Sequence, residues 1–545
     1  MMATASLNRR GFLKTMCLGT AGLAIPGCMK LSEQLAAGKQ AKNRPNIILI
    51  MADDLGFSDL GCYGSEIHTP NLDRLAEGGL RFTQFYNCAK CAPSRASLLT
   101  GLYPQQATVG KMTNRVNIAR ALRSVGYRTL MTGKNDGLPF LRDFDRYYGL
   151  DDGCCNYFNP GLRRPGENEP GRKYPSEQRR WVMDGKIIQP YTPEDKSFYT
   201  TDAFTDCAVQ YLEQYGKEDK PFFLYLPYTA PHFPLHAWPE DIARYRGRYR
   251  IGWDAIRQQR YERLVRLGLI DARWGLSPRD AAVPAWDQVE DKDGWDLTMA
   301  VYAAMIDRMD QGIGRIMAKV RELGVEDNTL VLFLSDNGAC AEDYRAFKTT
   351  AADIPPGPME SYRTQQAPWA NAANTPFRKF KWWVHEGGIA TPLIAYWPKV
   401  IKDGGRVTHE VGHIMDIMPT CLEIAGAEYP VSDNDEKVPC LEGKSLLPIF
   451  QGKPRQGHEV LYWRFGSSCA VREGKWKLVA PHPNPRTGID YFPEGGESGR
   501  KGSDEKRWEL YDMESDRTEL YNLADKYPQK VREMADLYEA WTARL

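Results

Sequence analysis

Short apolar runs alternate along most of the chain with segments in which apolar residues recur every three or four positions. Four continuous apolar runs, typical of strands buried on both faces of a parallel sheet, occupy residues 44–54, 220–232, 328–338 and 389–398. Helical spacing is found in residues 69–82, 297–324 and 409–427, and residues 117–134 combine a helix, a glycine and a strand. This alternation predicts an α/β fold with a large, mostly parallel sheet sandwiched by helices.

The pattern changes after residue 450. Short strands separated by turns are predicted at residues 459–465, 469–480 and 507–513, and a closing helix at residues 526–545. We therefore expect a large domain over residues 45–450 and a smaller C-terminal α+β domain over residues 451–545.

The first 29 residues predict an export signal. Arg9 and Arg10 precede an apolar run that is too short to span a bilayer, as in signals of the twin-arginine type. The run ends in IPGC, which resembles a lipoprotein cleavage box apart from its proline, so Cys28 is either the lipidated first residue or an ordinary part of the signal. Residues 30–44 predict a polar tether. We expect a bacterial protein exported by the twin-arginine machinery that is either periplasmic or anchored to a membrane through a lipid at Cys28.

Composition narrows the possible partners. The chain has 545 residues and a formal net charge of +1 from 71 basic and 70 acidic residues, so no nucleic-acid footprint is present. The 14 Trp and 28 Tyr suit sugar or aryl ligands, but large aromatic residues are more often ordinary core material. Of the 12 Cys, two lie in the predicted signal, and the other ten follow no regular disulfide or metal-binding spacing.

Two of the predicted strands end in pairs of hard oxygen ligands. Asp53 and Asp54 end the run at 44–54, and Asp336 and Asn337 lie near the end of the run at 328–338. Ligands of open parallel sheets bind beyond the carboxyl ends of the strands. Three carboxylates and an amide oxygen favour Ca2+ or Mg2+ over Zn2+. The alternative is that each pair only caps a following helix.

Basic side chains stand at equivalent places. Lys134 and His232 end predicted strands, and Arg95 and Lys381 lie in or beside loops. Each alone is more often a solvated charge. Together with a divalent cation they would form a pocket for a tetrahedral oxyanion.

Cys91 opens the stretch CAPSRASLLTG, residues 91–101. From the residues alone this thiol is a disulfide half, a small buried hydrophobe or a reactive centre. The stretch matches C-x-P-S-R-x-x-x-L-T-G at every fixed position, and the chain thereby resembles the type I sulfatases of the alkaline-phosphatase-like superfamily. NIILIMADD, GYRTLMTGK, SDNG and WELYDMESDRTELYNLA extend the resemblance from about residue 45 to the C-terminus.

The resemblance implies that Cys91 is converted to formylglycine by a formylglycine-generating enzyme. One hydroxyl of the aldehyde hydrate would attack sulfur, and the other would expel the sulfate as the aldehyde re-forms. It further implies one Ca2+ bound by Asp53, Asp54, Asp336, Asn337 and the oxygen of residue 91.

Four more roles follow from the same resemblance. Arg95 matches the residue that orients the hydrate, and Lys134 and Lys381 match the lysines that hold sulfate oxygens. His232 matches the histidine near the leaving oxygen, a candidate proton donor.

The chain departs from the family at Asp136. The family usually has histidine two residues after the lysine that corresponds to Lys134, where it assists collapse of the hydrate. Either Asp136 takes over as base, or another group such as His236 does, or Asp136 is a solvent-facing loop residue. An ionised Asp136 would also repel a bound anion.

The sequence thus predicts an exported, Ca2+-dependent sulfatase acting on sulfate monoesters, with sulfated carbohydrates ahead of small aryl esters. A phosphate or phosphonate monoester hydrolase of the same superfamily is the nearest alternative. A lipid-anchored binding protein with decayed catalysis is the alternative of another class.

Overall fold

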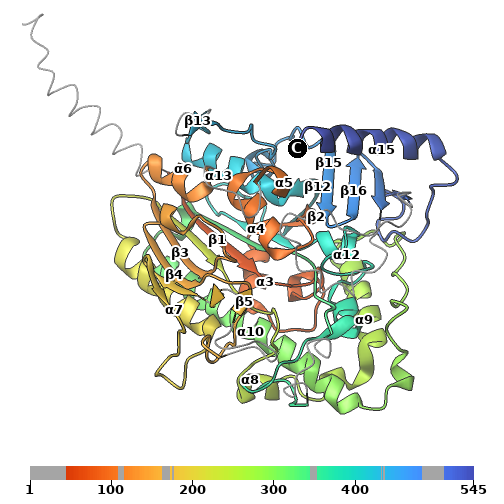
Figure 1. The fold of residues 1–545 in the computed structure, drawn as a ribbon, viewed down its shortest axis with the longest axis horizontal. Coiled ribbons are helices and arrows are strands. Elements are labelled where there is room, and N and C mark those ends of the chain that lie inside the picture. Colours follow the sequence, from red (N-terminus) through yellow and green to blue (C-terminus); the bar gives the residue numbers. More distant parts are fainter. Residues whose placement is uncertain are drawn as a thin grey trace, which may run out of the picture. The chain divides into compact units, whose positions relative to one another are not determined.

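A ten-stranded sheet forms the centre of the computed structural model (Figure 1). The structure describes residues 44–107, 116–162, 180–343, 353–430, 438–480 and 508–545, with the backbone of short strands at 172–174, 177–178, 432–433 and 436–437. The predicted export signal and the predicted tether up to residue 43 lie outside the described residues.

The sheet is mostly parallel, as predicted. Its order is β12-β2-β11-β10-β1-β9-β3-β4-β7-β8. The strands are β1 (Asn46–Ala52), β2 (Leu80–Tyr86), β3 (Arg128–Lys134), β4 (Arg146–Leu150), β7 (Trp181–Met183), β8 (Lys186–Ile188), β9 (Phe222–Pro227), β10 (Thr329–Ser335), β11 (Leu393–Tyr396) and β12 (Arg406–His413). The five central strands β10, β1, β9, β3 and β4 are mutually parallel. Strands β11, β7 and β8 run antiparallel to their neighbours.

Helices cover both faces of this sheet because the central strands are apolar on both. Ile48 and Ile50 of β1 belong to one buried cluster and Ile47 and Leu49 to the other. The first cluster includes residues of α3 (Pro70–Glu77), α7 (Thr200–Tyr215), α9 (Gly252–Arg266), α10 (Lys292–Glu322), α11 (Gln366–Ala373) and α12 (Glu386–Ile389). The second includes residues of α4 (Cys91–Thr100), α5 (Pro104–Ala107), α6 (Ile118–Ser124), α13 (Ile417–Ala425) and α14 (Leu447–Phe450). None of the described helices is both long and apolar enough to span a membrane.

The helix predicted over residues 409–427 is wrong in its first part. Residues up to His413 belong to β12, which pairs in parallel with β2, and the helix α13 begins only at Ile417. The apolar residues Val411, Ile414 and Ile417 recur every three positions and therefore imitate a helix. Pairing at the edge of the sheet overrides this local pattern.

The C-terminal α+β region has the predicted form. Strands β15 (Val460–Phe465), β16 (Ser468–Glu473), β17 (Trp476–Ala480) and β18 (Glu509–Asp512) make an antiparallel sheet. Helix α15 (Pro528–Ala543) packs against β16 and β17 (Figure 1). Trp463 and Trp541 belong to the same buried cluster as Ile48 of the large sheet. Residues 45–545 form one compact unit, and the boundary at residue 450 stays a prediction.

Candidate active site

The two pairs of oxygen ligands lie side by side at one edge of the sheet. Strands β1 and β10 are hydrogen-bonded neighbours in parallel register, with Ala52 opposite Ser335. Asp53 and Asp54 therefore emerge beside Asp336 and Asn337. All four are buried, and the Asp54 N–H donates to Asp336 Oδ1 at 3.2 Å. We call these four residues the carboxylate cluster.

The capping alternative does not fit the pairs. After Asp54 the next helical turn is the short 3-10 helix Gly61–Tyr63, and the described residues 338–343 after Asn337 are not helical. Asp54 also adopts a left-handed backbone conformation with φ of 66°. Such strain in a non-glycine residue is typical of functional sites.

Three buried cations from distant parts of the chain contact the cluster. Lys134 Nζ lies 2.6 Å from Asp53 Oδ2, and Lys381 Nζ lies 2.6 Å from Asp54 Oδ1. Arg95 donates to Asp336 Oδ2 through Nε at 3.1 Å and Nη2 at 2.7 Å. The structure thus brings together the three predicted carboxylates and these three predicted cations.

Two oxygens of the cluster remain available to a cation. Asp53 Oδ1 and Asn337 Oδ1 are buried and accept no hydrogen bond within the part of the chain that the structure describes. Buried acceptors without a donor are costly, and a missing ion is a common explanation. Their chemistry is that of a hard divalent cation site.

The pKa values of the cluster carboxylates also support a cation site. Burial and the charge of Asp53 raise the pKa of Asp336 to about 7, although Arg95 and Lys134 oppose the rise. Burial alone would raise the pKa of Asp53 as well, but the charges of Lys134, His232 and Arg95 together lower that pKa. One carboxylate of the three is therefore incompletely compensated by its neighbours, and a bound cation would supply the missing positive charge.

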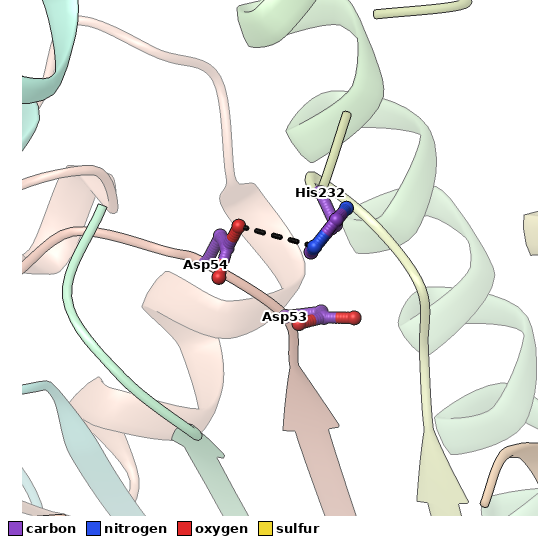
Figure 2. Close-up of side chains that lie close together, drawn as sticks. All are labelled: Asp53, Asp54 and His232. Carbon is purple, nitrogen blue, oxygen red and sulfur yellow. Dashed lines mark ion pairs between the residues drawn. The ribbon is translucent and has the colours of Figure 1, made fainter. Parts of the chain in front are cut away.

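His232 reaches the cluster from the loop after β9 (Figure 2). Its Nε2 lies 3.5 Å from Asp54 Oδ2, while Nδ1 lies 2.6 Å from the Phe233 carbonyl. One ligand atom each from Asp53, Asp54 and His232 fall within 4.8 Å of one another. Burial lowers the pKa of His232 to about 4, so the ring is neutral at neutral pH.

Cys91 is the first residue of α4 and is a nearly buried free thiol, with 6% exposure. It therefore forms no disulfide with another cysteine of the described residues. Burial and the negative charge of Asp136 raise the pKa of the thiol, against the positive charges of Lys134 and Lys381. An unmodified Cys91 would be a poor nucleophile, because the thiolate is the reactive form.

Asp136 is buried, at 5% exposure, and its Oδ2 lies 4.0 Å from Lys134 Nζ. A solvent-facing loop position therefore does not describe it. His236, the other candidate base, uses both ring nitrogens on the main chain. Its Nε2 lies 2.8 Å from the Ser361 carbonyl, and its Nδ1 accepts from the Tyr157 N–H.

Three residues beside the site were not expected from the sequence. Lys90, Glu342 and Trp382 contact one another next to Cys91 and Lys381. Two of them could have been identified as sequence neighbours of predicted site residues, because Lys90 precedes Cys91 and Trp382 follows Lys381. Nothing in the sequence marks Glu342.

Comparison with known proteins gives the family. The sequence model of the family described as Sulfatase matches residues 45–427. The chain belongs to the sulfatase family. This sulfatase is 33% identical over 562 residues to an uncharacterised sulfatase of Schizosaccharomyces pombe, a match that covers 93% of this chain and 96% of that protein. It is 32% identical over 459 residues to the arylsulfatase of Klebsiella aerogenes, with coverage of 77% and 96%.

A solved structure is similar over nearly the whole sulfatase. The structure of Ps i-CgsB in complex with k-i-k-neocarrahexaose has a TM-score of 0.61 and 25% identity, and the match covers 91% of this chain and 92% of that one. The fold class and the enzyme class inferred from the sequence are thereby confirmed. The residue roles stay predictions.

A cavity of about 560 Å³ near α3 and α8 (Pro239–Ala243) is a separate feature. Its lining includes Glu66, Asp73, Arg244 and Asp307, and none of the cluster residues. The cavity is therefore not lined by the carboxylate cluster.

Proposed function

We propose that the protein is an exported, Ca2+-dependent sulfatase that hydrolyses sulfate monoesters, chiefly of carbohydrates, through a formylglycine formed at Cys91. The observation that carries the proposal is the convergence of the carboxylate cluster, three buried cations and residue 91 at one edge of the sheet. Together they offer a hard cation site and several donors for a tetrahedral oxyanion.

Calcium would be held by Asp53, Asp54, Asp336, Asn337 and the oxygen of modified residue 91. When bound, it would lower the pKa of a coordinated hydroxyl and polarise a sulfate oxygen. The available oxygens of Asp53 and Asn337 support this assignment.

The remaining roles belong to side chains of this chain. Lys134 and Lys381 bind and orient sulfate oxygens, which become more negative as the sulfur–oxygen bond is rearranged. Arg95 holds Asp336 through two hydrogen bonds and donates to the Lys134 carbonyl at 3.2 Å, so it fixes the geometry around residue 91. The aldehyde hydrate at residue 91 would supply the attacking hydroxyl and, through its second hydroxyl, the route for sulfate release.

His232 is the proton donor to the leaving oxygen in this proposal. Because its pKa of about 4 leaves the ring neutral, donation requires the bound sulfate ester to raise that pKa. Overall, one water is consumed, the bond between sulfur and the ester oxygen breaks, and that oxygen leaves with a proton.

Asp136 is the proposed base for collapse of the hydrate. Its burial and its electrostatic influence on Cys91 and Lys134 support this role. The Lys134 ammonium, 4.0 Å away, reduces the repulsion between Asp136 and a bound anion.

Carbohydrate is the preferred substrate class. The similar structure Ps i-CgsB holds k-i-k-neocarrahexaose, and an exported enzyme meets extracellular glycans. We also propose that the protein is exported by the twin-arginine machinery, that a formylglycine-generating enzyme matures it, and that Cys28 is a possible lipid-attachment site. Small aryl sulfates are the second candidate, favoured by the similarity to an arylsulfatase.

The proposal is tested with protein co-produced with a formylglycine-generating enzyme. Mass spectrometry of the peptide that contains residue 91 establishes the modification, and turnover of 4-nitrophenyl sulfate is then measured. Wild type is expected to be active, and Cys91→Ala to lose about 10³-fold or more in kcat. Full activity in Cys91→Ala, or none in modified wild type, would refute the proposal.

The charge of the site separates sulfate from phosphate esters. Asp53, Asp54, Asp336 and Asp136 against Arg95, Lys134, Lys381 and a dication leave one net positive charge, which matches a sulfate monoester. A phosphate monoester carries close to two negative charges at neutral pH. Matched rates on 4-nitrophenyl sulfate and 4-nitrophenyl phosphate should therefore favour sulfate, and a preference for phosphate would support the alternative.

A further inference from the structure

Three partly exposed side chains lie close to the carboxylate cluster without belonging to it. Lys90 precedes Cys91, Trp382 follows Lys381, and Glu342 comes from the segment after β10. The Trp382 N–H donates to the Ala89 carbonyl at 2.9 Å, which ties the loop of Lys381 to the turn before Cys91. We call Lys90, Glu342 and Trp382 the rim residues.

The rim residues contact one another directly. Lys90 Nζ lies 3.8 Å from the centre of the Trp382 ring system, a cation–π contact. Trp382 Nε1 donates to Glu342 Oε1 at 2.9 Å. All three are partly exposed, whereas Lys381 and Asp54 behind them are fully buried. The rim residues are therefore accessible to solvent beside the buried cluster.

Glu342 carries a negative charge at this position. Burial alone would raise its pKa, but Lys90, Lys381 and His232 lower it. These partners belong to the rim and to the buried site, so charges of both act on the carboxylate. A negative charge in this place would repel the sulfate group itself.

The backbone around the rim is strained. Trp382 has φ of 85°, and Ala89 and Lys379 have φ of 63° and 68°. A bulky side chain at positive φ is a genuine outlier and persists only where the surroundings enforce it. The indole itself is held by its hydrogen bond to Glu342 and by an edge contact with Phe465 at 5.2 Å between ring centres.

We propose that Lys90, Glu342 and Trp382 form a subsite for the ring of a sulfated sugar, adjoining the sulfate pocket. Glu342 accepts hydrogen bonds from ring hydroxyls, Lys90 donates to a hydroxyl or ring oxygen, and the indole contacts the C–H surface of the ring. An aryl ester offers the indole a ring but gives Glu342 no hydroxyl. This inference rests on the proposed function and adds residues that select carbohydrate over aryl substrates.

The subsite is tested by measuring the selectivity of the enzyme for sugar sulfates over an aryl sulfate. The values of kcat/KM are compared for 4-nitrophenyl sulfate and for N-acetylgalactosamine 6-sulfate, N-acetylgalactosamine 4-sulfate and glucosamine 6-sulfate. In Glu342→Gln, which preserves shape, the sugar-to-aryl ratio of kcat/KM should fall at least about tenfold, because a hydroxyl loses a charged acceptor. Trp382→Ala and Lys90→Met should lower the same ratio. The exposed Glu410→Gln on β12 is the matched control and should keep the wild-type ratio.

Three results would overturn the subsite. One is a ratio in Glu342→Gln within about threefold of wild type. Another is an equal loss on sugar and aryl substrates, which indicates a merely structural role. The third is a modified wild type that cleaves 4-nitrophenyl sulfate but none of the three sugar sulfates. Failure to cleave any of the four substrates would instead count against the proposed function itself.

Discussion

The amide oxygen of Asn337 is a direct structural indication of a cation site. Its Nδ2 donates to Asp54 Oδ1 at 2.6 Å, and its Oδ1 is one of the two available buried acceptors. Replacement by Leu keeps the approximate volume and removes both groups. We expect Asn337→Leu to weaken Ca2+ affinity by at least about tenfold, measured by isothermal titration calorimetry. Asn46→Ala, at the opposite end of β1, should bind Ca2+ like wild type; equal affinities in the two variants would place the ion elsewhere.

Variants of Asp136 test whether this residue takes the place of the family histidine as the base. If it is the base, Asp136→Ala should lower kcat on 4-nitrophenyl sulfate by about 10²-fold or more. Asp136→His, which introduces the family residue, should recover much of that loss. An Asp136→Ala enzyme with undiminished kcat would assign the step to a different group.

A buried charge network links the C-terminal sheet to the element that follows the loop of Lys381. Glu386, the first residue of α12, accepts from Tyr86 at 2.9 Å and pairs with Lys477 of β17 at 2.8 Å and with Arg517 at 3.2 Å. Lys477 also lies 2.8 Å from Glu519. The C-terminal sheet thereby holds the segment that carries Lys381, and this is its structural contribution to the site.

Lys477→Met should therefore destabilise the protein by about 3–5 kcal/mol, because it leaves two buried carboxylates without their shared cation. Denaturant unfolding followed by fluorescence measures the change. The matched control is Lys475→Met, which removes an exposed lysine 2.9 Å from Asp512 and should change stability little. A similar small effect in both variants would mean that the network contributes nothing to folding.

The same network makes stability depend on acid. Burial alone would raise the pKa of Glu386, but Lys477, Arg517 and Arg472 lower it. Its stabilising contribution is therefore present above the unfolded pKa of about 4.5 and is lost as pH falls through the lower folded pKa. The difference in unfolding free energy between wild type and Lys477→Met should shrink in this acidic range. A difference independent of pH would exclude Glu386 as its source.

At the element scale, the central strands could be predicted because burial on both faces leaves an unbroken apolar run, as in residues 47–52 of β1. Strand β12 could not, because its half-exposed edge carries His409 and Glu410 and its apolar spacing continues into α13. The local sequence pattern indicates which faces of a strand are buried, but it does not indicate which partner strand buries them.

At the scale of the whole molecule, folding creates the site from segments that are far apart in sequence. The strand ends of Asp53 and Asp336 could be predicted to meet, because parallel strands share a carboxyl edge. The rim residue Glu342 could not, since its position depends on a long connection without a periodic signal. Asp136 could be noticed only as a departure from a family motif, and its burial required the fold.

Calcium binding should stabilise the whole fold if the cluster joins β1 to β10. A ligand that binds only the folded state at about 100 times its Kd adds about 2.7 kcal/mol. We expect Ca2+ to raise the Tm of wild type and to leave that of Asp53→Asn largely unchanged, in thermal unfolding followed by circular dichroism. Equal shifts in both proteins would indicate binding outside the cluster.

The proposed calcium site is tested most directly by locating the metal with anomalous diffraction, in crystals of the formylglycine-containing enzyme grown with Ca2+. The account predicts one strong peak about 2.3–2.6 Å from oxygens of Asp53, Asp54, Asp336, Asn337 and residue 91. A peak elsewhere, or none in an active preparation, would contradict it.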